Sequence, residues 1–239
     1  MFFQRPFIKR LRNKWREIPL GWGERIFSAD LLRLDDARFL EIWNAHNEAR
    51  RPFWYREQYA EQVAGKNLLD LGCGFSTDGI YFIQRGARVT FADIVPDNLK
   101  ATERAVKLLG LSANFYFIED VERFAFEEPF DYIFALGSLH HAPFEMVKKE
   151  VSALEPFLKP GGHFLFFSYP LERFKETGAR DFAEFGRMTD GKRTPWAEWY
   201  DDEKIKSLFA PAFTIIFSRN FGRQETDFNW FDLRKLPAP

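Results

Sequence analysis

The sequence predicts an α/β protein built on a doubly wound, mostly parallel sheet. Residues 67–98 read NLLDLGCGFSTDGIYFIQRGARVTFADIVPDN, which is the pattern of a strand, a glycine turn, a helix and a second strand. Short apolar strand patterns then alternate with helical patterns up to residue 168. Such alternation is typical of βαβ units, and 239 residues suffice for one large α/β domain with additions.

Composition places the chain among ordinary globular proteins. It is 46% hydrophobic and 29% charged, and its 29 phenylalanines predict a core rich in aromatic packing. The net charge of −1 gives no overall attraction to nucleic acid, which we regard as an unlikely partner. Cys73 is the single cysteine, so no internal disulfide can form and we expect a cytoplasmic protein. The sequence shows no apolar run of the roughly 18 residues that span a membrane, and no signal peptide.

The first 62 residues are expected to form a helical extension to a domain at 63–239. Residues 1–16 hold six Lys or Arg and no acid, whereas the remainder carries 28 basic and 35 acidic residues, a net of −7. The spacing predicts a basic amphipathic helix over 1–18 with an apolar side made of Phe7, Leu11, Trp15 and Ile18. This helix either lies on an anionic surface, such as the inner face of the membrane, or packs its apolar side on the domain. Residues 28–62 are again helical in pattern and end at Gly65.

The first strand and the glycine turn after it predict a nucleotide-type site. Leu68, Leu69 and Leu71 suit a buried strand, and Gly72 and Gly74 let the backbone approach a ligand. The helix that follows, from about Thr77 to Arg85, presents its N-terminal amides there. The next strand, Arg88 to Ala92, ends on Asp93, a carboxylate about twenty residues past the turn and within reach of a ribose diol.

Two positions distinguish this turn from a dinucleotide fingerprint. Thr77 stands where that fingerprint has its third glycine, and Asp70 would suit a cation rather than a pyrophosphate. The run Asp70-Leu71-Gly72-Cys73-Gly74 resembles the first motif of the class I S-adenosylmethionine (SAM)-dependent methyltransferases. In that family the acidic residue helps to hold the methionine ammonium group, and a glycine is frequent where this chain has Ser76.

The resemblance extends over about residues 67–217 and implies the rest of the sheet. It implies a seven-stranded Rossmann-like sheet in the order 3-2-1-4-5-7-6, with strand 7 antiparallel. After the first two strands we expect a helix from Pro96 to Gly110, a strand at 114–118, a strand at 132–136, a helix at 144–158, a strand at 163–168, a helix from Asp201 or Asp202 to Phe209, and strands at 213–217 and 229–233. The Leu158-Lys159-Pro160-Gly161-Gly162 turn before the fifth strand is a further recognisable feature of the family.

The resemblance also implies the cofactor and its ligands. SAM would be bound and S-adenosylhomocysteine released. Asp120, after the third strand, would accept the adenine amine, although a solvated loop carboxylate is the alternative. The expected cofactor-binding residues are Asp70, Gly72, Cys73, Gly74, Asp93, Ile94, Asp120, Val121 and Leu136.

The histidines after the fourth strand are the expected catalytic residues. Leu139-His140-His141 follows that strand, as in a common form of the family's fourth motif, and a histidine can act as a base at neutral pH. We favour His141 over His140 as the base or the acceptor-orienting group, while packing or backbone hydrogen bonding remains the alternative for either ring. No set of residues has the spacing of a metal site.

The acceptor would be bound by segments on either side of the cofactor domain. Residues 169–200 interleave basic and aromatic residues and are expected to be a substrate-side insertion, and the cluster Phe53-Trp54-Tyr55 either lines the same pocket or packs on the core. The candidate substrate residues are Tyr55, Tyr169, Arg173 and Trp196. We expect transfer to an O or N of a small or medium-sized acceptor, either neutral or anionic, such as a sugar, nucleotide-sugar or lipid-linked glycan. A non-catalytic SAM-fold assembly module and a protein or nucleic-acid methyltransferase are the alternatives.

Overall fold

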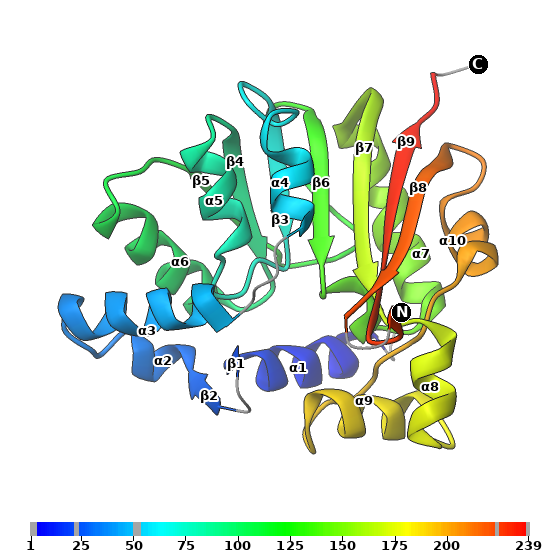
Figure 1. The fold of residues 1–239 in the computed structure, drawn as a ribbon, viewed down its shortest axis with the longest axis horizontal. Coiled ribbons are helices and arrows are strands. Elements are labelled where there is room, and N and C mark those ends of the chain that lie inside the picture. The colour runs from blue at the N-terminus through cyan, green and yellow to red at the C-terminus, as the bar shows by residue number, and fades with distance from the viewer. Residues whose placement is uncertain (1–3, 22–23, 50–53, 223–224, 238–239) are drawn as a thin grey trace. The chain divides into compact units, whose positions relative to one another are not determined.

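The computed structural model describes residues 4–21, 24–49, 54–222 and 225–237 (Figure 1). Its large sheet has seven strands in the order β5-β4-β3-β6-β7-β9-β8. In chain order from the first strand of the glycine turn, this is 3-2-1-4-5-7-6, as predicted. β9 is antiparallel to both of its neighbours, which confirms the predicted orientation of strand 7. The contacts divide the chain into two units, residues 12–118 and residues 119–239 with the chain up to Leu11, and each is described separately.

The unit of residues 12–118 contains the parallel strands expected around the glycine turn. β3 (Asn67–Leu71), β4 (Arg88–Asp93) and β5 (Asn114–Phe117) pair side by side, and Leu71 lies opposite Ala92. Between them run α5 (Asp78–Gln84) and α6 (Pro96–Leu108), which starts on proline as predicted. Because the register aligns the ends of β3 and β4, the residues that follow each strand are brought to one edge of the sheet.

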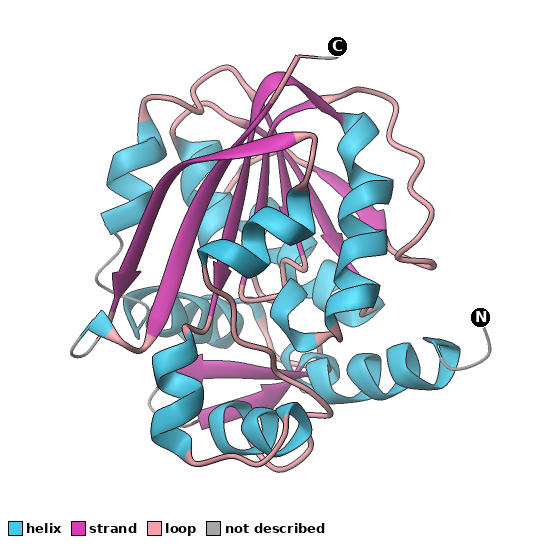
Figure 2. Cartoon of the chain, turned by 90° about the vertical axis from the view of Figure 1, so that its right-hand side faces the viewer, coloured by secondary structure: helices cyan, strands magenta, loops and turns pink. Residues whose placement is uncertain are grey.

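The chain before β3 contains elements that were only partly predicted. They are α1 (Gln4–Trp15), β1 (Glu17–Gly21), β2 (Glu24–Phe27), α2 (Ser28–Leu31), α3 (Asp36–Ala49) and α4 (Trp54–Ala60). The strands β1 and β2 form a separate two-stranded sheet (Figure 2), which the helical reading of residues 1–18 missed. Ile18 is therefore in a strand, where it pairs with Ile26, and the helix ends at Trp15.

The end of α1 is packed rather than solvated. Leu11 and Lys14 are buried, and Arg12 donates a hydrogen bond to the carbonyl of Ile118 at 2.9 Å. The side-chain amide of Asn98 donates to the carbonyl of Trp15 at 3.1 Å. Part of the predicted amphipathic face is thus used within the protein. No helix in the described part of the chain is long and apolar enough to cross a membrane.

The unit of residues 119–239 holds the other half of the sheet. It contains β6 (Phe130–Leu136), β7 (Leu158–Ser168), β8 (Phe213–Phe221) and β9 (Phe228–Lys235), with the 3-10 turn η1 (Leu139–His141), α7 (Phe144–Leu154), the 3-10 turn η2 (Glu155–Phe157) and α10 (Asp202–Phe209). The helix predicted at 144–158 ends at Leu154, because Pro156 has no backbone N–H with which to continue it. The fifth strand starts at Leu158, before the glycine pair, and its pairing with β6 is irregular there.

Residues 169–200 are partly helical. α8 (Leu171–Thr177) ends on Gly178 in the left-handed conformation, and α9 (Phe182–Asp190) begins with Asp181, whose carboxylate accepts from the backbone N–H of Glu184. We call residues 191–200, which follow α9 without helix, the strap. Trp199 in the strap forms a bridge with Tyr169 at the end of β7.

Candidate active site

The glycine turn after β3 is held by hydrogen bonds from the neighbouring strand. Gly72 and Gly74 have φ angles of +72° and +57°, which side chains rarely adopt. The backbone N–H groups of Gly72 and Cys73 both donate to the carbonyl of Ala92, at 2.7 and 3.1 Å. A Cβ added to Gly74 would meet no atom within 4 Å, so the space beside this residue is open.

Asp70 is a buried carboxylate in contact with the turn. The hydroxyl of Ser76 donates to Asp70 Oδ2 at 2.6 Å, and the same hydroxyl accepts from the N–H of Gly79 at 3.1 Å. Ser76 therefore replaces the frequent glycine with a side chain that connects Asp70 to the start of α5. Its role could not be read from spacing alone, because it depends on which way the Asp70 carboxylate points.

Asp93 organises the other side of the turn. Its Oδ2 accepts from the N–H of Gly74 at 2.8 Å and its Oδ1 from the N–H of Val95 at 2.7 Å. The carboxylate is 4% exposed, and burial raises its pKa to about 6, an effect that the backbone hydrogen bonds only partly offset. Ile94 is half-buried beside it, as expected of a residue that contacts a flat base. Cys73 is also half-buried, and burial together with Asp93 and Asp70 raises the pKa of its thiol.

Side chains that the sequence reading missed fix the turn from two helices. On α6, Thr102 Oγ1 donates to the carbonyl of Gly74 at 2.9 Å and accepts from the N–H of Ser76 at 3.2 Å. On α3, Trp43 Nε1 donates to the carbonyl of Ser76 at 3.1 Å. The only sequence signal for Thr102 is a polar residue on the apolar face of a helix.

Tyr55 supports the start of α5. Its hydroxyl donates to Asp78 Oδ1 at 3.0 Å, and Arg56 Nε donates to the same oxygen at 2.6 Å. Arg56 and Asp78 are 3% and 6% exposed, so they form a buried ion pair, which the sequence reading did not identify. Arg56 also donates to Thr77 Oγ1 at 2.8 Å. Tyr55 therefore has a packing and orienting role in this structure, and Phe53 of the predicted aromatic cluster lies outside the described residues.

The predicted adenine-side residues lie in the other unit. Asp120 is exposed, and its Oδ1 accepts from the N–H of Glu122 at 3.0 Å. Val121 is buried, while Leu136 is half-buried at the end of β6.

His140 and His141 form the turn η1 directly after β6. His141 Nδ1 lies 3.2 Å from the carbonyl oxygen of Trp196 in the strap. A carbonyl can only accept, so Nδ1 carries the proton of the neutral ring and Nε2 carries the lone pair. His140 is 1% exposed, and burial together with His141 lowers its pKa well below 6.5. His140 is thus held neutral, with its ring 4.6 Å from that of Tyr169.

The other predicted substrate residues are engaged with the protein. Tyr169 is buried and donates to both oxygens of Asp190, at 2.9 and 3.1 Å. The Arg173 guanidinium lies over the Tyr169 ring at 4.3 Å and donates to the carbonyl of Asp227 at 2.6 Å. Trp196 is half-buried, with its indole N–H donating to Glu198 at 3.1 Å. The structure therefore brings Trp196 to His141, whereas Tyr169 and Arg173 of α8 pack on each other and on Phe228.

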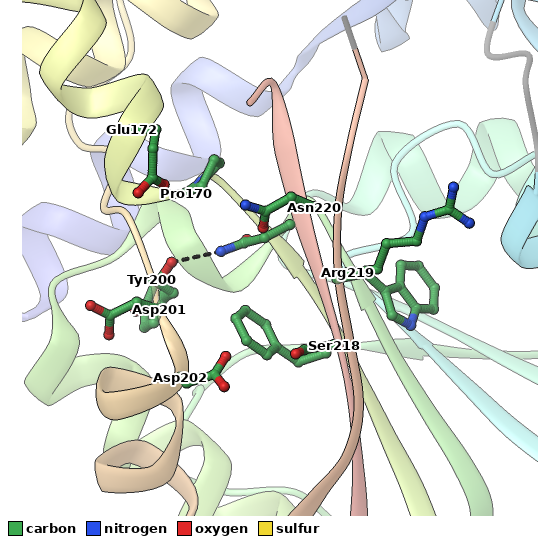
Figure 3. A pocket seen from close by; sticks show the side chains of 11 residues that line it. Pro170, Glu172, Tyr200, Asp201, Asp202, Ser218, Arg219 and Asn220 are labelled. Carbon is green, nitrogen blue, oxygen red and sulfur yellow. Dashed lines mark hydrogen bonds between the residues drawn. The ribbon is translucent and has the colours of Figure 1, made fainter. Parts of the chain in front are cut away.

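A cavity of about 470 Å³ lies beside the end of β7 (Figure 3). One side carries three carboxylates, those of Glu172, Asp201 and Asp202, and the strand β8 contributes Ser218 and Asn220. The remaining lining residues are Pro170, Tyr200, Arg219, Asn229, Trp230 and Phe231. This excess of acidic over basic side chains disfavours a phosphate group there.

The turn, the buried Asp93 and the methyltransferase-like motifs agree with the comparisons to known proteins. Residues 68–162 match the family model described as "Methyltransferase domain". The chain therefore contains a class I SAM-dependent methyltransferase domain. The residues fit that cofactor: the open side of Gly74 leaves room for it, Asp93 offers a carboxylate for a diol, and Asp70 offers a second one for an ammonium group.

Curated relatives of this methyltransferase-domain protein have more than one kind of name. The chain is 32% identical over 112 residues to the ubiquinone biosynthesis O-methyltransferase of Idiomarina loihiensis, covering 46% of this chain and 45% of the relative. It is 27% identical to the protein of the same name from Nitrosospira multiformis, covering 74% and 78%. It is also 31% identical to the S-adenosyl-L-methionine-dependent Diels-Alderase iccD of Talaromyces variabilis, covering 66% and 56%. The chain thus spans about half the length of several curated relatives that it matches.

Solved structures share the fold. A SAM-dependent methyltransferase from Clostridium acetobutylicum matches with a TM-score of 0.63 at 16% identity, covering 84% of this chain and 99% of that one. The N-methyltransferase NodS from Bradyrhizobium japonicum, in complex with S-adenosyl-l-homocysteine, matches with a TM-score of 0.57 at 17% identity, covering 87% and 96%.

Proposed function

We propose that this protein transfers a methyl group from SAM to a hydroxyl group of a small acceptor, with His141 as the general base. The observation that carries the proposal is the hydrogen bond between His141 Nδ1 and the Trp196 carbonyl. It leaves Nε2 as the nitrogen that can accept a proton. A base is required for a hydroxyl acceptor, and the O-methyltransferase names of the curated relatives support the same reaction class.

The residues that would hold the cofactor are those around the glycine turn. Asp93 would bind the ribose diol, Asp70 the methionine ammonium group, and the Gly72–Gly74 backbone would lie against the ligand. When bound, SAM supplies a methyl group already activated by the positive sulfur. The protein's task is then to position the acceptor, exclude water and remove one proton.

The proton of the acceptor hydroxyl would pass to His141 Nε2 as its oxygen gains the methyl group. The resulting imidazolium keeps its Nδ1–H bond to the Trp196 carbonyl and later returns the extra proton to water. Both histidines are buried, at 1% and 3% exposed, so the choice of His141 rests on the hydrogen bond to the Trp196 carbonyl that fixes its tautomer. For His140, burial together with His141 lowers the pKa well below 6.5. General-base catalysis of this kind contributes about 10²–10⁴-fold in rate.

For the acceptor we propose a hydroxylated ring compound or sugar without a phosphate group. Two arginines of the insertion that could pair with the phosphate of a nucleotide-sugar or lipid-linked glycan are engaged within the protein. Arg173 donates to the Asp227 carbonyl, and Arg180 pairs with Glu184 at 2.8 Å. The carboxylates of the cavity beside β7 also disfavour a phosphate.

The test combines cofactor binding with turnover. Purified protein and SAM are incubated with a panel of phenols, catechols and neutral sugars, and S-adenosylhomocysteine is quantified. We expect an active hydroxyl acceptor, a loss of about 10²–10⁴-fold in kcat for His141→Gln, and unchanged SAM affinity by calorimetry. His163→Gln is the matched control, since His163 bonds Asp232 at 2.9 Å in the sheet. Equal turnover of His141→Gln and the native protein would overturn the assignment of the base.

The Diels-Alderase relatives support one competing function, in which SAM is bound but its methyl group is not transferred. It would be favoured if SAM bound tightly and no member of the panel yielded S-adenosylhomocysteine. The same outcome would be expected of an assembly module, and conversion of a diene-containing probe would separate these two readings.

A further inference from the structure

We propose that Glu198 is a positioning residue that sets the tautomer and orientation of His141 through the strap. The proposal rests on the proposed function, because it concerns how the base of that reaction is prepared. Glu198 is 3% exposed and lies two residues after Trp196. The Trp196 carbonyl accepts the hydrogen bond from His141 Nδ1. No motif in the sequence marks it.

Glu198 connects the strap to both ends of the histidine turn. Its backbone N–H donates to the carbonyl of His140 at 2.8 Å. Its Oε2 accepts from the N–H of Phe144, the first residue of α7, at 3.1 Å. Glu198 therefore bonds to the chain on both sides of His141, to the carbonyl of His140 and to the N–H of Phe144.

The hydrogen bond from the Phe144 N–H to Glu198 gives α7 a side-chain cap that its own cap residue does not provide. The residue at the cap position of α7 is Pro143, which makes no side-chain cap hydrogen bond. A helix N-terminus has amide groups without partners and favours a negative charge. Glu198, which comes from a segment 54 residues later, serves both needs.

Glu198 also holds the residue that contacts the base. The same Oε2 accepts from Trp196 Nε1 at 3.1 Å, so one oxygen binds both α7 and the Trp196 side chain. The backbone of this part of the strap is confined as well, because a Cβ on Gly186 of α9 would lie 2.7 Å from the Trp196 carbonyl carbon. The Trp196 carbonyl is thereby fixed in direction, and with it the position of the Nδ1 proton of His141.

Lys204 pairs with the Glu198 carboxylate and holds it in place. Lys204 Nζ lies 2.8 Å from Glu198 Oε1 and 3.2 Å from the carbonyl of Trp199. Glu198 is almost fully buried and Lys204 partly so, which makes their attraction less screened by water than that of a surface pair. Removing the carboxylate would leave Lys204, Phe144 N–H and Trp196 Nε1 without this acceptor.

The experiment reads the tautomer of His141 directly, with no acceptor needed. Long-range ¹H–¹⁵N spectra of the imidazole groups are recorded for the native protein, Glu198→Gln and Glu198→Ala, with His141→Gln to assign the signal. Glu203→Gln is the matched control, because Glu203 pairs with Lys206 at 2.9 Å on the surface of the adjoining helix. Trp196→Phe removes the indole donor but keeps the backbone carbonyl, and it replaces Glu198→Ala if that variant does not fold.

We expect the native protein and Glu203→Gln to show His141 as the Nδ1–H tautomer. The Glu198 and Trp196 variants should shift it toward Nε2–H, and Glu198→Gln should lose about tenfold or more in kcat with SAM affinity unchanged. An unshifted tautomer in all of these variants would overturn the proposal. A shifted tautomer together with native turnover in His141→Gln would instead retain the positioning role and reject His141 as the base.

Discussion

Glu150 gives the strongest stability prediction in the structure. It lies on α7, is 9% exposed, and burial raises its pKa from 4.5 to about 8. Between these two values the native state holds a proton that the unfolded state has lost. Stability must therefore fall as the pH rises through this window, until the native carboxyl also ionises.

The magnitude follows from the shift of about 3.5 pKa units. At about 1.4 kcal/mol per unit, the full effect of ionisation on the free energy of unfolding is about 5 kcal/mol above pH 8. At pH 6 the free energy of unfolding has fallen by only about 2 kcal/mol. A further decrease of about 3 kcal/mol is therefore expected between pH 6 and pH 9. Glu150→Gln keeps the size of the side chain and removes its ionisation. The difference in stability between variant and native protein should thus move by about 3 kcal/mol in favour of the variant.

The assay is equilibrium urea unfolding, followed by tryptophan fluorescence, at several pH values between 6 and 9. Glu145→Gln on the same helix is the control, since Glu145 is exposed, and its difference from the native protein should not change with pH. Any fixed cost of placing an amide at residue 150 cancels, because only the pH dependence is compared. A difference between Glu150→Gln and native protein that stays constant from pH 6 to pH 9 would refute the reasoning.

Two further predictions concern the glycine turn. SAM affinity should decrease as the pH falls below about 6, approaching tenfold per pH unit, because Asp93 then takes up a proton. Asp93→Asn should bind SAM weakly at every pH, and calorimetry at pH 5, 6 and 7.5 separates this result from general acid instability. Gly79→Ala should destabilise the protein by about 1–3 kcal/mol, because its Cβ would overlap Phe91 and lie 2.6 Å from Asp70 Oδ2. Urea unfolding measures that loss, and a change below about 0.5 kcal/mol would contradict the packing argument.

The turn at Gly72 and the strands beside it could be predicted because their causes are local, whereas the order of the seven strands was implied by the resemblance to the methyltransferase family. An apolar run, a glycine pair and a helical pattern recur within about thirty residues, and a parallel register then brings Asp93 to the same edge as Gly74. The β1–β2 hairpin was missed for a comparable reason. Ile18 continues a helical spacing from Trp15, and only its pairing with Ile26 reveals the strand.

The supports of the turn could not be predicted, since they depend on contacts between distant parts of the chain. Thr102 and Trp43 reach the Gly74–Ser76 backbone from α6 and α3, 28 and 33 residues away in sequence. The sequence gives Arg56 the appearance of an ordinary surface charge, and only the structure shows that it pairs with the buried Asp78. A charged residue in an amphipathic segment carries no local sign that it will be buried.

The same difference between local causes and distant contacts applies to cofactor binding and to the proposed general base. Cofactor binding depends largely on backbone shape, so the glycines and the strand ends that create that shape are visible in the sequence. Preparation of the proposed base would depend on a side-chain network, in which Glu198 and Trp196 reach the histidine turn from more than fifty residues away. His141 was predicted as the base from its place after a strand, whereas its hydrogen bond to the Trp196 carbonyl in the strap required the structure. Because the role proposed for Glu198 concerns the tautomer of His141 and not the binding of SAM, a variant there should separate turnover from cofactor binding.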